Sequence, residues 1–405
     1  MLPSVTMTVE VQPACPPRVS GDPPGVVAGS RRLMAHRQTL DAIGRQAWEQ
    51  LARRTPWATP FSRWAFHRAW WDAYGDTAHD ETLVVHDETD DGGPVAIAPL
   101  MHRHFHESSD AAMATELRHG AEPTITPLAA AAKVVFMGAS YHADYATLLC
   151  APEDLGAVAD AIAAAIAAPD TGGDQPEPWD AVDLRRLRCG DPAVDALAVA
   201  FARREVDRGW TFNLEREDVC PVVSLPDDAD LEGYLATLGK KDRHEIRRKV
   251  RRAEAAGSVD LVDSADPVAD LPAFIDLHQR RWGEHGLFPD GPGGDRSRVL
   301  FQRLFEEFAA DGDIMRLSFL HIGQRRVGAA VWFREGDTDY YYNAGLDPAA
   351  RDLSPGVVLI ERSVRRAVAE GIHRLDFLRG DEPYKYEWGA IDEPIVRLLV
   401  RRTGA

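Results

Sequence analysis

The sequence predicts an α+β fold in which two similarly ordered halves each form a mixed sheet flanked by helices. Three observations support this fold class. Short β-branched and aromatic runs alternate with stretches of helical periodicity along the chain. The same order of elements occurs twice, although no direct sequence repeat is visible. The 405 residues, of which 45% are hydrophobic, can build more than one core.

The first half begins after a Pro- and Gly-rich stretch without periodicity, so residues 1–37 are expected to be a disordered lead. Leu40, Ile43, Ala47 and Leu51 recur at helical spacing and predict the first helix. Aromatic residues after Pro60 predict a second helix, in which core packing explains them best. The remaining elements are strands at 82–86, 94–101, 134–137 and 145–149, a helix at 155–168, a strand at 181–184 and a helix at 192–204.

The second half repeats this order. Gly323-Gln324 and Glu335-Gly336-Asp337 are short turns typical of hairpins between three successive strands. The predicted elements are a strand at 219–225, a basic helix at 240–256, a strand at 259–262, helices at 271–282 and 299–310, strands at 315–322, 326–334 and 338–345, a helix at 355–370 and strands at 374–378 and 395–401. We therefore expect domains at 38–212 and 213–405.

Charge and composition exclude several classes of function. The net charge of −18 opposes binding to DNA, and we expect no DNA partner. The N-terminus has no signal-peptide pattern and no stretch is long and apolar enough for membrane insertion, so a cytoplasmic protein is expected. The four cysteines form no CxxC pair, and only the alternation of His102, His104 and His106 hints at ligands, so no metal site is expected.

The first motif with chemical content lies between a strand and a helix. Pro355 suits the first helical turn, Ser354 is a natural N-cap, and Gly356 lets a ligand approach the backbone closely. Free amides at a helix start bind anions, so Ser354–Val357 could hold a phosphate. An ordinary capped helix is the alternative.

The second motif is the segment 375–389. Asp376 lies between apolar Leu375 and Phe377, so it points away from one core face. Lys385 stands among Tyr384, Tyr386 and Trp388, where a lysine can pair with an anion or transfer a proton. A surface loop in which Lys385 pairs with a neighbouring carboxylate fits the pattern equally well.

The third motif is the basic helix, whose residues 240–252 carry eight basic and two acidic side chains. Arg243, Arg247 and Arg251 share one face and could clamp a phosphorylated or acidic partner. A solvated helix in which Glu245 pairs with its neighbours is the alternative.

Together these motifs resemble the Gcn5-related N-acetyltransferase (GNAT) superfamily, in particular its CelD-like or BioF2-like branch, a relative of the Fem peptidyltransferases. The resemblance covers residues 219–390. It rests on the basic helix, Leu277-His-Gln-Arg-Arg-Trp282, Val327-Gly-Ala-Ala-Val331, Leu353-Ser-Pro-Gly356 and the Gly-Asp-x-x-Tyr-Lys-x-x-Trp-Gly element ending at Gly389. It implies tandem GNAT-like domains, each with a sheet that splays open to admit an acyl donor.

The resemblance also implies the donor and the residues that hold it. Acyl-CoA, as acetyl-CoA, would serve as co-substrate, with its pyrophosphate at the helix start and its pantetheine along the preceding strand. The cofactor-binding residues would be Tyr342, Asn343, Arg351, Leu353, Ser354, Gly356 and Val357. Only Arg351 and Gly356 match the glycine-rich phosphate loop of the superfamily, a departure that weakens the assignment of the donor.

The implied activity is N-acyl transfer by direct attack of an amine on the thioester. Lys385 matches a lysine that assists transfer in Fem proteins, and its removal is expected to abolish turnover with little loss of stability; Asp376 is the second catalytic candidate. The acceptor would be a small molecule or sugar amine, as in an envelope polysaccharide precursor. Its expected contacts are Arg243, Arg247, Trp282, Tyr341 and Tyr384. The alternatives are a Fem-like transferase that uses aminoacyl-tRNA, which the net charge opposes, and a degenerate GNAT pair that acts as a binding or assembly module.

Overall fold

The computed structural model describes residues 31–90, 92–103, 125–129, 132–167, 179–208, 210–226 and 230–402. Its first half runs through β1 (Leu33–Arg37), α1 (Leu40–Arg54), α2 (Trp64–Tyr74), β2 (Ala78–Asp80), β3 (Leu83–Asp87), β4 (Ala96–Ala98), β5 (Leu100–Arg103), β6 (Val134–Met137), β7 (Leu149–Cys150), α4 (Leu155–Ala167), β8 (Ala181–Arg188), α5 (Pro192–Arg208) and β9 (Trp210–Ser224).

The second half of the chain follows strand β9. It contains α6 (Leu231–Thr237), α7 (Lys240–Ala256), β10 (Val259–Asp263), α8 (Pro267–Trp282), α9 (Pro292–Phe308), β11 (Met315–Ile322), β12 (Arg325–Glu335), β13 (Thr338–Leu346), α10 (Pro355–Ala369), β14 (Arg374–Asp376), α11 (Pro383–Tyr386) and β15 (Ile391–Arg402).

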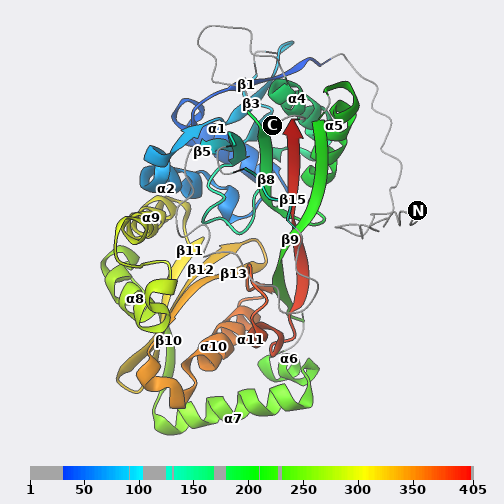
Figure 1. The fold of residues 1–405 in the computed structure, drawn as a ribbon. Coiled ribbons are helices and arrows are strands. Elements are labelled where there is room, and N and C mark those ends of the chain that lie inside the picture. The colour runs from blue at the N-terminus through cyan, green and yellow to red at the C-terminus, as the bar shows by residue number, and fades with distance from the viewer. Residues whose placement is uncertain are drawn as a thin grey trace, which may run out of the picture.

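The second half begins with two additional helices, α6 and α7. From β10 onward it repeats the order of the first half: a strand, two helices, a series of strands, a helix, a strand, a helix and a last strand (Figure 1). In the first half Pro99 divides one strand into β4 and β5, and residues 138–148 divide another into β6 and β7. The strands at the corresponding places of the second half, β12 and β13, are each uninterrupted. The α+β fold and its tandem arrangement, predicted from the sequence, are confirmed.

The halves exchange their last strands. The larger sheet has eleven strands in the order β10-β11-β12-β13-β14-β9-β15-β8-β6-β5-β2. Strand β9 of the first half therefore pairs with β14 of the second, and β15 of the second half pairs with β8 of the first. The long antiparallel pair of β9 and β15 crosses the middle of the molecule (Figure 1), so the sheet is continuous between the halves.

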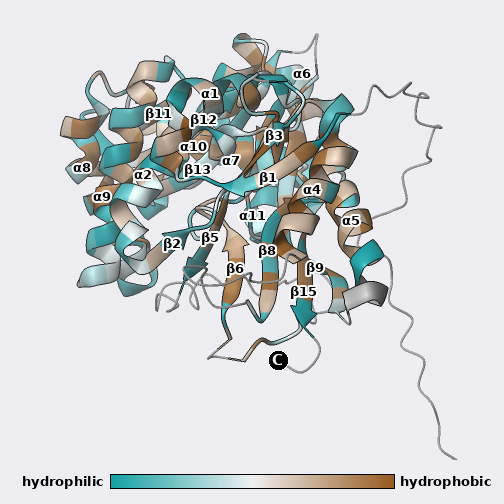
Figure 2. Cartoon of the chain, turned by 90° about the horizontal axis from the view of Figure 1, so that it is seen from above, coloured by the Kyte–Doolittle hydropathy of each residue, from teal (hydrophilic) through white to brown (hydrophobic). Residues whose placement is uncertain are grey.

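A shared aromatic core also joins the halves. Helix α2 packs against α9. Phe61 lies 5.6 Å from Phe333, measured between ring centroids, and Phe301 stacks on Tyr342 at 5.7 Å. A second core fills the first half between α4, α5 and strands β6 and β8, and both α4 and β6 are hydrophobic in Figure 2.

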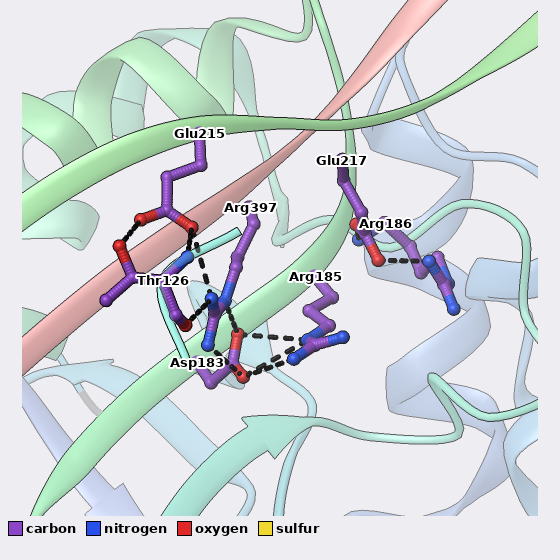
Figure 3. A network of polar contacts seen from close by, with 7 residues as sticks. All are labelled: Thr126, Asp183, Arg185, Arg186, Glu215, Glu217 and Arg397. Atoms are coloured by element: carbon purple, nitrogen blue, oxygen red, sulfur yellow. Dashed lines mark hydrogen bonds and ion pairs between the residues drawn. The ribbon is translucent and has the colours of Figure 1, made fainter. Parts of the chain in front are cut away.

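A buried polar network fastens the exchanged strand β15 to the first half (Figure 3). The guanidinium of Arg397, on β15, donates hydrogen bonds to both carboxylate oxygens of Asp183 on β8 and to Glu215 on β9. The backbone oxygen of Thr126 accepts a further bond from it. Arg397 and Asp183 are fully buried, so loss of one partner would strand an uncompensated charge.

Several expectations differ from the structure in detail. Residues 33–37, placed in the disordered lead, form β1 because they pair with Leu83–Asp87; residues 1–30 lie outside the described residues. Helix α9 begins at Pro292, seven residues before the predicted start, because a proline suits the first helical turn. The domain boundary expected at 212/213 falls inside β9 and remains a proposal.

The described residues contain neither a membrane-spanning helix nor a metal-binding cluster. No helix there has both the length and the apolar character needed to cross a bilayer. No group of three His, Cys, Asp or Glu residues there is arranged to hold a metal ion. Of the three alternating histidines, His104 and His106 lie outside the described residues, while the Nδ1 atom of His102 bonds the backbone oxygen of Val134.

Candidate active site

A pocket of about 360 Å³ opens where β13 and β14 diverge. The two strands pair in parallel only over Thr338–Tyr340 and Arg374–Asp376, so β13 continues from Tyr341 without β14 beside it. The pocket is lined by Tyr141, His142, Asp144, His278, Arg281, Trp282, His285, Gly286, Leu287, Tyr341, Tyr342, Asn343, Ala344, Phe377, Arg379, Gly380, Glu382, Tyr384 and Lys385. It therefore combines the free edge of β13, the end of α8, the segment after β14 and a loop of the first half.

The local backbone explains why β13 presents this edge. The register against β12 shifts between Val331 and Trp332, which leaves Tyr342 as the extra residue of a β-bulge. The hydroxyl of Tyr342 donates to the backbone oxygen of His142, which ties the loop of the first half to the strand. The indole N–H of Trp282 donates to the oxygen of Ala344 at 3.3 Å, which joins α8 to the same edge.

Gly345 sets how closely α8 approaches β13. A Cβ atom at Gly345 would lie 2.4 Å from the backbone nitrogen of His278 and 2.6 Å from the carbonyl carbon of Leu277. No side chain fits in that space. The wall of the pocket formed by α8 therefore depends on a glycine at this position.

The charged lining consists of two ion pairs and one further cation. Asp144 contacts Arg379 at 3.3 Å, and Lys385 contacts Glu382 at 2.9 Å. Arg281 hydrogen-bonds with Tyr341 and lies over the ring of Trp282, and no described carboxylate pairs with it. The pocket thus offers two carboxylates for a cationic group and one uncompensated cation for an anionic group.

Lys385 lies at the pocket with its ammonium group already satisfied. Its Nζ donates to the backbone oxygens of Leu378, Arg379 and Gly380 at 3.1, 2.9 and 2.8 Å. These three acceptors use all three protons of the ammonium, and Glu382 adds an ion pair. Lys385 therefore holds the 378–380 turn against the pocket, and these bonds argue against the expectation that it could be removed with little loss of stability.

Asp376 lies beneath the pocket and does not line it. It is 1% exposed, and its carboxylate accepts hydrogen bonds from the Tyr145 hydroxyl and the Leu378 amide, both at 2.7 Å. Burial raises the pKa of Asp376 to about 6. Leu378 has a φ of 56°, so the bonds from Asp376 and Lys385 stabilise a turn that is unfavourable for leucine.

Two histidines of the lining are neutral at pH 7. Burial lowers the pKa of His142 to about 3 and that of His278 to about 4. The Nε2 atom of His142 bonds the Tyr74 hydroxyl at 2.8 Å, and His278 hydrogen-bonds with the Asn343 side chain. Both rings therefore act as neutral hydrogen-bonding groups in the pocket.

The start of α10 offers fewer free amides than the sequence predicts. The amide of Ser354 bonds the oxygen of Arg351, the amide of Val357 bonds the oxygen of Ser354, and Pro355 has no N–H. Gly356 alone has an amide for which no described residue serves as acceptor. The expectation of several unpaired amides at Ser354–Val357 is corrected to one.

Two cations accompany this amide. The guanidinium of Arg252, at the end of α7, donates to the Ser354 hydroxyl at 2.7 Å, which leaves the N–H of Gly356 uncapped by a side chain. Arg351 is exposed. Leu353 packs against the core of the second half and offers no polar group of its own beyond the backbone.

The structure thus divides the predicted site residues among three places. Lys385, Trp282, Tyr341, Tyr342, Asn343 and Tyr384 line the pocket between β13 and β14. Arg351, Leu353, Ser354, Gly356 and Val357 lie at the start of α10. Arg243 and Arg247 line a different groove, between α6, α7 and α10, and are not among the residues of the pocket.

Sequence reasoning missed the residues that complete the pocket from elsewhere in the chain. Asp144 and His142 come from the first half, and Arg281 precedes Trp282 on α8. Asp144 belongs to none of the three motifs that the sequence displays. That it meets Arg379 depends on the packing of the two halves, which no local pattern reveals.

Comparisons with known proteins agree with this architecture. Residues 240–386 match the family model described as "Acetyltransferase (GNAT) domain". No curated protein matches the sequence. Among solved structures, FemX is 11% identical with a TM-score of 0.55, covering 90% of this chain and 96% of its own. A conserved protein of unknown function from Bacteroides thetaiotaomicron is 12% identical with a TM-score of 0.51, covering 92% and 100%. These likenesses show the fold that the whole chain shares with both.

Proposed function

From a chain whose residues 240–386 form a GNAT acetyltransferase domain within a Fem-like fold, we propose an acyltransferase that moves an acyl group from a coenzyme A thioester to an amine. The observation that carries the proposal is the divergence of β13 from β14 around a pocket. A strand edge left unpaired at a pocket can hydrogen-bond an extended ligand as a further strand would.

The donor would occupy this edge. Its pantetheine arm would lie along Tyr341–Ala344, with Asn343 and Tyr342 beside it, and its phosphate would meet the amide of Gly356 and the cations Arg252 and Arg351. The positive end of the α10 dipole favours an anion at that point. Acetyl-CoA is the simplest donor of this kind.

The acceptor would enter from the side of the first half. Its ammonium group would meet Asp144 and Glu382, the two carboxylates of the lining, and Arg281 would hold an anionic part of the same molecule. In the reaction the ammonium first loses one proton, to a carboxylate of the lining or to water, because only the neutral amine has a free lone pair. The amine nitrogen then bonds the thioester carbon, the carbon–sulfur bond breaks, and the second proton lost by nitrogen is gained by the thiolate. Orientation of the two reactants supplies much of the rate.

Lys385 and Asp376 would act as positioning residues. Both bond the 378–380 turn, which presents Arg379 and Gly380 to the pocket. The proposed acceptor is a sugar amine of an envelope polysaccharide precursor. The proposed branch is the CelD-like or BioF2-like one, and the proposed location of the protein is the cytoplasm.

The test uses thermal melts with acetyl-CoA. A ligand that binds only the folded chain raises the melting temperature, so acetyl-CoA is expected to raise it. Gly356→Pro removes the free amide and should weaken acetyl-CoA binding by about tenfold, because a hydrogen bond to a charged group contributes roughly 1.5–3 kcal/mol.

Gly356→Ala is the matched control, since it keeps the amide. Melts of both variants without ligand report any strain that either change introduces. An unchanged melting temperature of the wild-type chain at millimolar acetyl-CoA would contradict the proposed donor and favour a binding or assembly module.

A further inference from the structure

A second groove, of about 550 Å³, lies between α6, α7 and α10 and is not used by the proposed reaction. Its floor is formed by Leu235, Ile246 and Val250, which are buried in the core of the second half. Its cationic lining comes from one face of α7, at positions three or four residues apart, with one residue of α10. The cationic residues are Lys240, Arg243, Arg247, Arg251 and Arg365, and the carboxylates Glu232, Glu254 and Glu361 line the groove with them.

Helix α7 carries more cationic side chains than there are carboxylates paired with them. Arg247 pairs with Glu232 and Arg248 pairs with Glu245. Six other basic residues of α7 form no ion pair with a described carboxylate, although Lys249 lies near enough to Glu245 to lower the pKa of its carboxyl: Lys240, Lys241, Arg243, Lys249, Arg251 and Arg252. Residues 240–252 carry a net charge of +6 within a chain of net charge −18. Such a patch attracts acidic partners that the rest of the surface repels.

The cationic helix leads to the expected donor site. Helix α7 lies along the edge of the second half, next to α6 and below α10 (Figure 1). Its last turn reaches the start of α10 through the bond from Arg252 to Ser354. The groove and the entrance for the donor phosphate are therefore parts of one surface.

The number of free amides at that entrance favours a donor with one phosphate. Gly356 provides the single free amide of the stretch 354–357, as the bonds of Ser354 and Val357 show. Coenzyme A brings a diphosphate, whereas the phosphopantetheine arm of a carrier protein brings one phosphodiester. A carrier protein also supplies its own acidic surface for α7.

We propose that the acyl group arrives on the phosphopantetheine arm of a small acidic carrier protein that docks on the groove between α6, α7 and α10. The inference rests on the proposed acyl transfer and names its natural donor. Carboxylates of the carrier would meet the cations of α7. The arm would then pass Gly356 and enter between β13 and β14.

The test measures binding of a fluorescently labelled acidic acyl carrier protein, loaded with an acetylated phosphopantetheine arm, to the full chain. Lys240→Glu/Arg251→Glu is expected to weaken binding by about tenfold or more, because charge reversal removes electrostatic attraction. Binding of the wild-type chain should also weaken as salt rises. The variant should keep the response of the wild-type chain to acetyl-CoA.

Arg53→Glu/Arg54→Glu is the matched control. It reverses the same charge at exposed positions at the end of α1, in the other half, and should leave carrier binding unchanged. Equal loss in both variants would show non-specific attraction and overturn the docking site, as would displacement of the carrier by an aminoacyl-tRNA at physiological salt.

The two proposals fail separately. A chain that responds to acetyl-CoA but does not bind the acetylated carrier loses the docking site and keeps the acyltransferase assignment. A chain that binds neither donor loses both.

Discussion

The Nζ atom of Lys385 meets three backbone oxygens and a carboxylate within 3.1 Å, and its side chain is 3% exposed. Loss of the ammonium would leave those oxygens and Glu382 without their donor. Buried polar groups left unpaired in this way cost about 1–3 kcal/mol each at most sites. The structure thus assigns Lys385 a large share of the stability of the 378–380 turn.

Lys385→Met is therefore expected to lower the free energy of unfolding by about 2–5 kcal/mol. Chemical denaturation with an unchanged slope would measure this loss. A wild-type midpoint in the variant would show that the ammonium does not hold the turn.

Asp376 gives a prediction for pH dependence. Its pKa in the folded chain is about 6, above the ordinary value of 3.8. Between those values the folded chain keeps a proton that the unfolded chain loses, so Asp376 lowers the stability progressively as pH rises from about 4 to 6, and the cost remains above pH 6.

Asp376→Asn removes this titration and keeps both hydrogen bonds, since an amide can accept from Leu378 and donate to Tyr145. Relative to the wild-type chain, the variant should gain roughly 2 kcal/mol between pH 4.5 and 7.5. The histidines are common to both proteins and cancel in the difference. A difference that does not change with pH would contradict the raised pKa.

At the scale of elements, the contact of α8 with β13 shapes the pocket. Gly345→Ala places a Cβ atom within 2.4 Å of α8 backbone, so the helix must shift. Overpacking of this kind costs about 1–3 kcal/mol. We expect a lower melting temperature and a weaker response to acetyl-CoA.

Gly328→Ala is the control for this substitution. Its Cβ atom would approach the Cδ2 atom of the Leu346 side chain at 3.1 Å, and a side-chain end can move where a backbone cannot. Gly328→Ala should therefore lower the melting temperature and the response to acetyl-CoA less than Gly345→Ala does. The reverse order would show that α8 is free to move away from β13.

Most elements could be predicted because their patterns are local. The basic helix at 240–256 and the strand at 315–322 coincide with α7 and β11, since the periodicity of each is set by its own residues. Strand β1 was missed because its alternation is weak and its partner β3 lies 46 positions further on. The exchange of β9 and β15 was missed because sequence patterns do not specify which strands pair.

The residues of the candidate site also divide into those that a local motif reveals and those that only the fold brings to the pocket. Lys385, Tyr341 and Trp282 belong to motifs that a single segment displays. Asp144 reaches the pocket only through the fold, and the groove that holds Arg243 and Arg247 is separate because α7 packs beside α10 rather than near β13. Residue type indicated the chemistry of these side chains but not their location.

For the whole molecule, the strand exchange makes the halves interdependent. Residues 226–405 alone would lack β9, which lies between β14 and β15 in the sheet. The fragment is expected to be unfolded or aggregated, and co-expression with residues 1–225 should restore a folded complex. Circular dichroism of the isolated fragment checks this; a cooperative melt of residues 226–405 would contradict the required exchange.

The two halves also differ in their capacity for a donor. Helix α4, the counterpart of α10, follows a short turn over Pro152–Asp154 that brings Glu153 and Asp154 to its start, where Asp154 pairs with Arg31. Carboxylates there repel a phosphate, whereas Gly356, Arg252 and Arg351 attract one. The proposed function therefore predicts one donor site per chain, in the second half.

A crystal structure with acetyl-CoA tests the number and location of the donor sites most directly. We predict electron density for one molecule per chain, with the pantetheine along Tyr341–Ala344, the thioester in the pocket beside Asp144, and a phosphate on the amide of Gly356. Density in the first half, or an empty space between β13 and β14 while acetyl-CoA is bound elsewhere, would contradict an acyltransferase site in this pocket.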